Sequence, residues 1–265
     1  MRKLIKQWLG AITTAQRNLK PTAILSPGDH IWNTTEQQME IWNGVAWVPI
    51  AVGGYTGGSL HLYEDFIGTV VDPMWTATLN GAGNINMLVG ANSVIGGAVR
   101  LQDTGAAGAN DAALSLGTNR GISVLAGLLG WVTNVRVGTV LAGNGTRVRA
   151  VMHNNGAYGA VGDWFGFEFD AAANANWRLK GTSGGGAVSN QDTGVPVVAG
   201  QFYLLAMAPD STLAFRAYID GVYVGTLPLV NTTPAQLEPL FYVDDGGLAA
   251  GNPINYDVDL LAVWQ

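Results

Sequence analysis

Five segments between residues 163 and 227 decide the fold: DWFGFEFD (163–170), DTGVPVVAG (192–200), QFYLLAMAPD (201–210), TLAFRAYIDG (212–221) and VYVGTL (222–227). Each is a short alternating or continuous apolar run bounded by Gly, Asp, Asn or Pro, a pattern typical of successive antiparallel strands. Asp220-Gly221 predicts a type I′ hairpin, because that turn requires positive φ at both central residues. The stretch therefore predicts an all-β fold.

The same pattern continues over the rest of the chain from His61 onward. Short strand-like runs are separated by turn signals at intervals of roughly ten residues, and no segment of helical length has a period of 3.6. The pattern predicts a jelly-roll sandwich of two antiparallel sheets over residues 59–265. The uncharged, Gly-rich residues 53–59 are predicted to be a flexible linker in front of it.

Residues 22–58 form a predicted small β unit with its linker. Strand-like runs at 30–33, 39–42 and 46–50 follow one another, and Asn43-Gly44 between the last two is a hairpin signal. Three Trp residues in this short unit predict a compact aromatic cluster.

Residues 1–21 are predicted to form an amphipathic helix that ends at Pro21. Apolar residues recur at three- and four-residue spacing on one face, and most basic residues lie off it. The helix either packs on its own domain or anchors the chain in a partner. The residues assigned to the anchor are Leu4, Ile5, Trp8, Leu9 and Ile12 with Arg2, Lys3 and Lys6.

The composition limits the classes of function. Only 12% of the 265 residues are charged and 48% are hydrophobic, which argues against disorder and favours burial between subunits. Residues 1–20 contain five basic residues and no acidic one, so the rest of the chain has eight basic and 19 acidic residues. That acidic body is not expected to bind nucleic acid. The chain has no Cys and no apolar run of transmembrane length.

Two resemblances to known families follow from these segments. IWNTTEQQMEIWNGVAWV (31–48) resembles short β repeats of bacteriophage tail-fibre and other virion proteins. From Glu64 onward the order of segments resembles the concanavalin A-like (laminin-G-like) jelly rolls of phage structural proteins. The segments that carry this second resemblance are EDFIG (64–68), WVTNVRV (131–137), FGFEFD (165–170), NWRL (176–179), FRAYIDGVYVGTL (215–227) and YDVDLLAVW (256–264). It implies two curved antiparallel sheets and no single activity.

Glycoside hydrolysis on this fold would need two carboxylates about 5–5.5 Å apart for retention of configuration. Retaining glucanases of this kind carry E-x-D-x-E or E-x-D-x-x-E on one strand, and Glu168 and Asp170 match the first two positions. The third position would fall on Ala172 or Ala173, so the general acid is missing. No catalytic residue is therefore expected, and the protein is predicted not to be an enzyme.

Glu168, Asp170 and Asn174 also match part of the metal-binding strand of legume lectins. The later ligands of that family would fall on Leu179 and Gly184, and hard cations prefer six or more oxygen ligands. We favour the alternative that Glu168 and Asp170 face outward on a strand. No cofactor is expected, although a metal ion on these three residues stays open.

Aromatic residues could bind a glycan by stacking. Trp177 lies in the polar stretch ANANWRL (173–179) beside a Gly-rich loop, so it is the candidate for glycan contact. Other Trp residues of the jelly roll are expected in the core or at an interface, because most strand aromatics pack inward. These are Trp75, Trp131, Trp164 and Trp264.

These observations predict a non-enzymatic bacteriophage virion protein: a capsid decoration or short head-fibre protein attached through its N-terminal region. Its expected partners are capsid or other virion proteins, in a homotrimer at the particle surface after synthesis in the host bacterial cytoplasm. No membrane span and no nucleic acid are expected. The alternatives are a tail-fibre or spike component that binds host-surface glycans, or an enzyme that acts on polysaccharide.

Overall fold

The computed structural model describes most of the strands of the chain. The described residues are 8–25, 29–36, 38–42, 45–49, 60–64, 66, 71–81, 83–88, 98–103, 111–116, 122–123, 130–138, 146–154, 164–183, 186–210, 214–228, 236–244 and 254–264. Within them, no helix is long and apolar enough to cross a membrane. The predicted linker 53–59 and the predicted Asn43-Gly44 turn lie outside the described residues.

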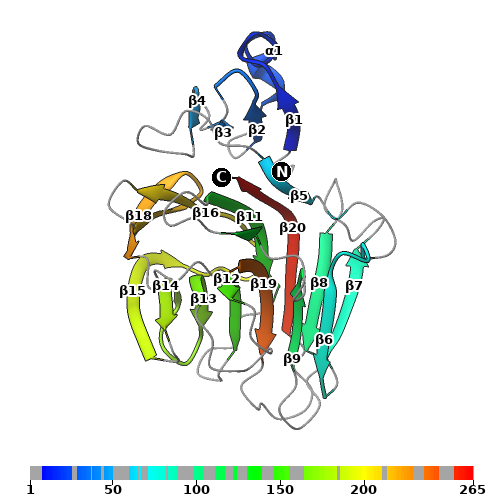
Figure 1. Cartoon of the computed structure of the whole chain (residues 1–265), viewed down its shortest axis with the longest axis vertical. Helices are drawn as coiled ribbons and strands as arrows, with labels where there is room; N and C mark the ends of the chain where they lie inside the picture. The colour runs from blue at the N-terminus through cyan, green and yellow to red at the C-terminus, as the bar shows by residue number, and fades with distance from the viewer. Residues whose placement is uncertain are drawn as a thin grey trace.

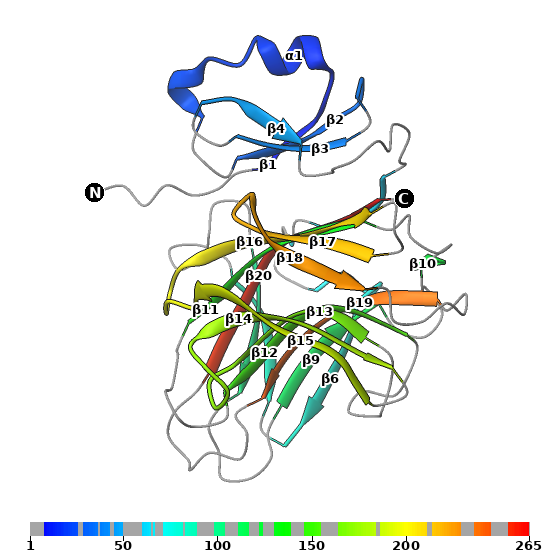
Figure 2. The same cartoon turned by 90° about the vertical axis from the view of Figure 1, so that its left-hand side faces the viewer.

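A small sheet lies at one end of the molecule, beyond two larger sheets (Figure 1, Figure 2). Its strands, in spatial order, are β1 (Trp8–Ile12), β2 (His30–Asn33), β3 (Gln38–Trp42) and β4 (Trp47–Pro49). β1 runs parallel to β2, and the other pairs are antiparallel. The rings of Trp42 and Trp47 lie 5.6 Å apart, so at least two of the three tryptophans form the predicted cluster.

The prediction of one helix over residues 1–21 is wrong for the described part of that segment. Residues Trp8–Ile12 form strand β1, and only Thr14–Asn18 form an α-helix, α1, which is followed by a 3-10 helix at Thr22–Ile24. An isolated helix of this length is marginal in water, whereas β1 gains a hydrogen-bonded neighbour in β2. Leu9 and Ile12 are half-buried, while Leu19, on the expected apolar face, is 82% exposed. The anchor residues from Arg2 to Lys6 lie outside the described residues.

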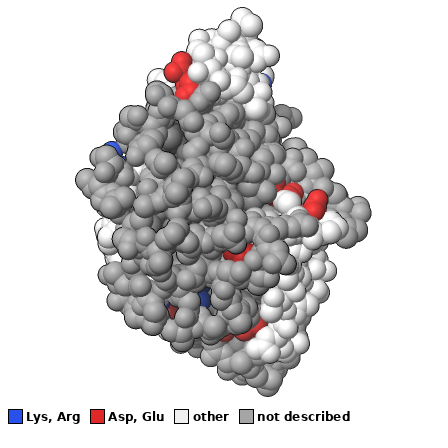
Figure 3. Space-filling model, viewed as in Figure 1, with Lys and Arg blue, Asp and Glu red and all other residues white. Residues whose placement is uncertain are grey.

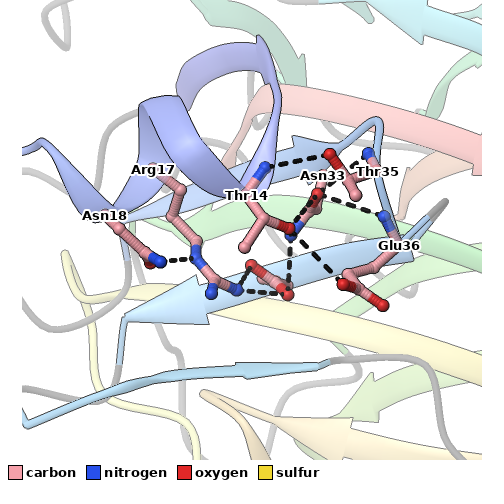
Figure 4. Close-up of polar contacts among 7 residues, drawn as sticks. Thr14, Arg17, Asn18, Asn33, Thr35 and Glu36 are labelled. Carbon is pink, nitrogen blue, oxygen red and sulfur yellow. Dashed lines mark hydrogen bonds and ion pairs between the residues drawn. The ribbon is translucent and has the colours of Figure 1, made fainter.

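Polar contacts fix α1 on the small sheet. Thr13 caps the helix by accepting from the Gln16 amide, and the Gln16 side chain accepts from the Thr13 amide. Arg17 donates to both carboxylate oxygens of the buried Glu40 on β3, at 2.7 and 2.6 Å. Thr14 and Asn33 hydrogen-bond to each other, and Figure 4 shows these helix side chains pointing at the β2–β3 turn. The helix is thus tied to the sheet below it.

The jelly roll consists of two large sheets, each named here after a central strand. The β12 sheet has the order β15 (Gly186–Pro196), β14 (Asn176–Ser183), β13 (Trp164–Asp170), β12 (Arg147–Asn154), β19 (Gln236–Asp244), β9 (Asp111–Ser115) and β6 (Thr76–Asn80), with β10 (Ile122–Ser123) also paired to β19. The β11 sheet has the order β18 (Val222–Pro228), β17 (Ala214–Ile219), β16 (Phe202–Asp210), β11 (Gly130–Val137), β20 (Ile254–Trp264), β8 (Ala98–Asp103) and β7 (Asn84–Leu88), with β5 (Leu60–Glu64) also paired to β20. All pairs within these two sheets are antiparallel.

The core lies between the two large sheets, which face each other in Figure 2. Aromatic contacts cross from one sheet to the other, because alternate residues of each strand point inward. The joined rings are Phe165–Phe215 at 4.5 Å, Trp177–Tyr203 at 5.8 Å and Trp131–Phe167 at 5.9 Å. The predicted all-β sandwich of two antiparallel sheets is confirmed.

The hairpin at Asp220-Gly221 is also confirmed. It joins β17 to β18, and its two residues have φ of 52° and 80°, as a type I′ turn requires. The alternation on β13 is likewise as predicted: Phe165, Phe167 and Phe169 belong to the core, whereas Glu168 and Asp170 point away from it. The outer face of the β12 sheet therefore carries the polar residues of this strand.

Candidate site on the outer face of the β12 sheet

The outer face of the β12 sheet collects polar side chains from four strands. Two rows of paired residues cross it. One row joins Glu168 on β13, Arg149 on β12 and Tyr242 on β19. The other joins Trp164, His153 and Glu238 on the same three strands. Because side chains alternate between faces, these residues share one surface although they are far apart in sequence.

Glu168 is the centre of the first row. Its Oε2 accepts a hydrogen bond from Arg149 Nε at 2.7 Å, and its Oε1 accepts one from Lys180 Nζ on β14 at 2.6 Å. The residue is only 1% exposed, although it points away from the hydrophobic core. Both oxygens of this poorly solvated carboxylate therefore have a cationic hydrogen-bond partner.

Two aromatic rings enclose the Arg149 guanidinium. Its central carbon lies 4.6 Å from the ring centroid of Trp164 and 5.1 Å from that of Tyr242. Lys180 Nζ lies 5.6 Å from the Trp164 centroid. These are cation–π distances. We name Trp164, Arg149, Glu168, Lys180 and Tyr242 together the Glu168 cluster.

The second row contains a histidine–carboxylate pair. His153 Nε2 lies 3.1 Å from Glu238 Oε1, but neither His153 Nε2 nor Glu238 Oε2 makes a hydrogen bond within the described part of the chain. The residues are 9% and 3% exposed. Buried polar atoms without partners are uncommon, and a bound water molecule or a functional role can account for them.

A third group of charges lies at the other end of β12. Arg147 is 3.3 Å from Asp170 Oδ2 and 3.8 Å from Asp244 Oδ2. Burial works to lower the pKa of Arg147, but the carboxylates of Glu168, Asp170 and Asp244 outweigh it and raise that pKa. Arg147 thus offsets part of the negative charge of the two aspartates beside it. On the face seen in Figure 3, the charged atoms of described residues are scattered rather than gathered in one patch of a single sign.

The three residues considered for a metal ion have other partners. Glu168 contacts two cations, Asp170 contacts Arg147, and Asn174 Nδ2 donates to Asp192 at 2.6 Å. A backbone hydrogen bond from Gly194, with another from Asn176, lowers the pKa of Asp192. Among the described residues, no group of three or more acidic or histidine side chains is arranged to hold a metal ion.

The assignment of glycan contact to Trp177 is wrong. Trp177 is fully buried and packs on Phe169 and Tyr203 in the core. Trp164, expected in the core or at an interface, is instead half-buried on the outer face beside Arg149 and Lys180. Local polarity around Trp177 was a weaker guide than strand alternation, because Trp177 and Leu179 point inward while Arg178 and Lys180 point outward.

Sequence reasoning did not assign Arg149, Lys180, Tyr242, His153 or Glu238 to a site. A signal was present in RVRAVMHN (147–154), whose alternation puts two arginines and the histidine on one face. The strand order that brings β13, β14 and β19 beside it is not readable from local pattern. Ala172 and Ala173, the positions of the missing acid, lie exposed in the turn after β13.

Several solved structures that are similar to this chain are of carbohydrate-acting enzymes. One is the GlcNAcα1-4Gal-releasing endo-β-galactosidase of Clostridium perfringens, with 13% identity and a TM-score of 0.57 over 80% of this chain and 64% of the galactosidase. This chain therefore spans less than two thirds of that enzyme. The β-glucanase of Bacillus licheniformis has 16% identity and a TM-score of 0.53, covering 79% of this chain and 99% of the glucanase.

A third similar structure is the endo-β-1,4-glucuronan lyase of the fungus Trichoderma reesei, with 16% identity and a TM-score of 0.55 over 77% of this chain and 95% of the lyase. At such identities the likeness shows the fold. It nevertheless overturns the expectation of a non-enzymatic virion structural protein, because the neighbours are glycoside hydrolases and a lyase. The expected homotrimer, virion partners and particle-surface location stay predictions.

No curated protein sequence matches the chain. Residues 140–265 match the family model described as the concanavalin A-like lectin/glucanases superfamily. That region includes β12, β13, β14 and β19, which carry the Glu168 cluster. Residues 140–265 are thus similar to the concanavalin A-like lectin/glucanases superfamily, in agreement with the jelly roll that they help to form.

Proposed function

We propose that this chain is a polysaccharide-acting enzyme whose glycan lies across the outer face of the β12 sheet, with Glu168 at the reaction centre. One observation carries the proposal: a carboxylate 1% exposed, on the face away from the core, is held between two cations and next to a half-buried Trp ring. The fold neighbours that cleave glycans support the same reading.

The Glu168 cluster is poorly explained as a stabilising element alone. Burying charged groups costs desolvation energy, and replacing a buried ion pair with apolar residues is often neutral or stabilising. The inner face of β13 already packs Phe165, Phe167 and Phe169 into the core. A charged cluster added to the opposite face fits a requirement for chemistry or recognition.

Hydrolysis of a glycosidic bond would use Glu168 in its ionised form. Each of its carboxylate oxygens accepts a hydrogen bond from a cation, and we assign it the role of nucleophile or of base toward water. Asp170 is the next outward residue on β13, about 7 Å further along the strand. Glycosidase carboxyl groups are separated by about 5 to 9.5 Å, so Asp170 is the second carboxylate that the strand offers.

A second reaction, β-elimination, is favoured by a specific observation: the ring of Tyr242 lies 5.1 Å from the guanidinium carbon of Arg149. In this reaction a base takes the proton from C5 of a uronate, C4=C5 forms, and the C4–O4 bond breaks as O4 gains a proton. Cations that offset the uronate carboxylate make C5–H more acidic, and a phenol can transfer the protons.

The test is to incubate the full chain with a panel of purified β-linked polysaccharides and measure two products. Reducing ends report any cleavage, and ultraviolet absorbance of the C4=C5 bond reports elimination alone. Glu168→Gln should lower the rate of hydrolysis by at least about a hundredfold, within the range for a catalytic acid or base. Glu36→Gln, in an exposed turn of the small sheet, is the matched control.

Two results would contradict the proposal. A folded wild-type protein that releases no product from any polymer, and binds none, would rule out polysaccharide as the substrate. Full activity in Glu168→Gln would place the reaction away from Glu168. Asp170→Asn, measured alongside, separates the two carboxylates: loss in both variants is expected for hydrolysis.

A further inference from the structure

We infer that the glycan is acidic, and that a uronate carboxylate binds the terminal nitrogens of Arg149 with Lys180 beside it. This inference rests on the proposed function and names its substrate class. It is carried by the way in which Arg149 is held, by the balance of charge in the Glu168 cluster, and by the aromatic ring next to it.

Arg149 uses only part of its hydrogen-bonding capacity. Nε donates to Glu168, while the two terminal nitrogens make no hydrogen bond within the described residues. The side chain is 21% exposed, and the rings of Trp164 and Tyr242 fix the plane of the guanidinium. A guanidinium held in this way, with two terminal nitrogens that have no hydrogen-bond partner among the described residues, matches the planar, bidentate geometry of a carboxylate.

A comparison within the chain shows that this arrangement is not general for its arginines. On the β11 sheet, Arg100 and Arg136 each donate Nε and a terminal nitrogen to the fully buried Asp257. Those guanidinium groups are therefore occupied by the protein's own carboxylate. Arg149 instead shares its carboxylate with Lys180, and its terminal nitrogens have no hydrogen-bond partner in the part of the chain that the structure describes.

The charges of the Glu168 cluster do not cancel. Arg149 and Lys180 supply two positive charges against the one carboxylate of Glu168, whereas Arg147 at the end of β12 faces two aspartates and is also attracted by Glu168. The positive excess is therefore local to Arg149 and Lys180. A positive excess in a poorly solvated site attracts an anion more strongly than it would in water. The hydroxyl groups of a neutral sugar cannot supply the missing negative charge, but a uronate carboxylate can.

Trp164 offers an aromatic surface for a sugar ring next to this charge. It is half-buried on the same face and lies within cation–π distance of both Arg149 and Lys180. A pyranose that packs its apolar face on the exposed part of the ring would carry its C5 carboxylate toward the two cations. The same residues would thus select both the ring and its charge.

The experiment compares one polymer in two forms: a β-linked glucuronan and the same glucuronan after chemical reduction of its carboxyl groups. Binding by the full chain is measured at low and at high salt. We expect at least tenfold tighter binding of the acidic form, with the difference shrinking as salt rises. Arg149→Gln should bring the ratio of the two affinities close to one, and Lys180→Gln should lower it.

Arg149→Lys keeps the positive charge but removes the planar guanidinium, which can bind both oxygens of a carboxylate. This variant should therefore retain only part of the preference for the acidic polymer. Melting curves of all variants identify any that fail to fold. If Arg149→Gln fails to fold, Arg149→Lys and Lys180→Gln test whether the two cations select the acidic polymer.

Equal binding of both polymer forms, or unchanged preference in these variants, would overturn the inference while leaving the proposed function in place. A sulfated polymer bound more tightly than the glucuronan would overturn the assignment to a carboxylate. Binding of no polymer in either form would contradict the proposed function itself.

Discussion

Trp164 and Trp177 lie on the neighbouring strands β13 and β14 but on opposite faces of one sheet. Trp177 is fully buried against Phe169 and Tyr203, while Trp164 covers the cations of the Glu168 cluster. Trp177→Ala should therefore lower the free energy of unfolding by about 3–5 kcal/mol, as for large core residues. Trp164→Ala should cost much less stability and should weaken glycan binding. Urea unfolding and binding of the preferred polymer measure both, and equal losses of stability would contradict the assignment of faces.

Glu168 and Glu238 provide a second matched pair on the outer face. Glu168 contacts two cations, whereas Glu238 faces only His153 and leaves Oε2 without a partner in the described residues. Glu168→Gln leaves two partly buried cations uncompensated and should destabilise by about 3–5 kcal/mol. Glu238→Gln removes a buried charge that lacks a strong partner, so stability should stay within about 1 kcal/mol or rise. Chemical denaturation of both variants at neutral pH measures their free energies of unfolding. A larger loss in Glu238→Gln than in Glu168→Gln would contradict the roles given to the two carboxylates.

Gly166 occupies the middle of β13 with φ of +154°, and a Cβ there would meet the backbone oxygen of Ala150 at 2.5 Å. Gly166→Ala must push β12 and β13 apart, and we expect a loss of about 1–3 kcal/mol or more in unfolding free energy. Gly200→Ala is the control, because its φ is also positive, +76°, but nothing lies within 4 Å of the added atom. Its cost should be limited to backbone conformation, about 1–2 kcal/mol. A larger loss at Gly200 than at Gly166 would be inconsistent with the clash.

We expect Tyr256 to make the stability of the protein sensitive to alkali. Burial raises the pKa of its phenol well above the ordinary value, so the folded protein keeps the proton where the unfolded chain loses it. Above about pH 10 the unfolded state therefore binds fewer protons, and the free energy of unfolding falls as the pH rises toward the folded-state pKa. Below that pH the contribution is fully present.

Tyr256→Phe should flatten this alkaline decline at little cost in stability, because the hydroxyl has no hydrogen-bond partner among the described residues. Burial also raises the pKa of Tyr203, so part of the slope should remain in the variant. Urea denaturation at a series of pH values from 8 upward measures the slope. An identical decline in both proteins would show that Tyr256 is not its source.

Much of the fold was predictable from local pattern. The alternation in DWFGFEFD assigned the two faces of β13 correctly, and Asp220-Gly221 identified its hairpin, because both depend on residues that are adjacent in sequence. The apolar spacing at residues 4–12 was misleading. This spacing fits one side of a helix. Residues 8–12 instead form backbone hydrogen bonds with β2, and residue spacing alone does not reveal such a pairing.

The site was harder to predict, because it depends on which strands become neighbours. Glu168 was recognised as a candidate carboxylate, but its partners Arg149 and Lys180 come from β12 and β14. Tyr242 comes from β19, nearly a hundred residues after Arg149 in the chain, and lies opposite it only through the register of that pair. The glucanase pattern places its carboxylates on a single strand. It therefore cannot predict a cluster whose residues come from four neighbouring strands of a sheet.

The position of β20 has a consequence for how the protein is made. β20 lies between β11 and β8 and also pairs with β5, and it follows all three in the chain. β19 has the same relation to β12, β9 and β10 in the other sheet. During synthesis on the ribosome, each sheet therefore stays divided, with inner strand edges unpaired, until one of these late strands emerges. Such edges invite association between chains, so the nascent protein is expected to depend on chaperones until β19 and β20 are in place.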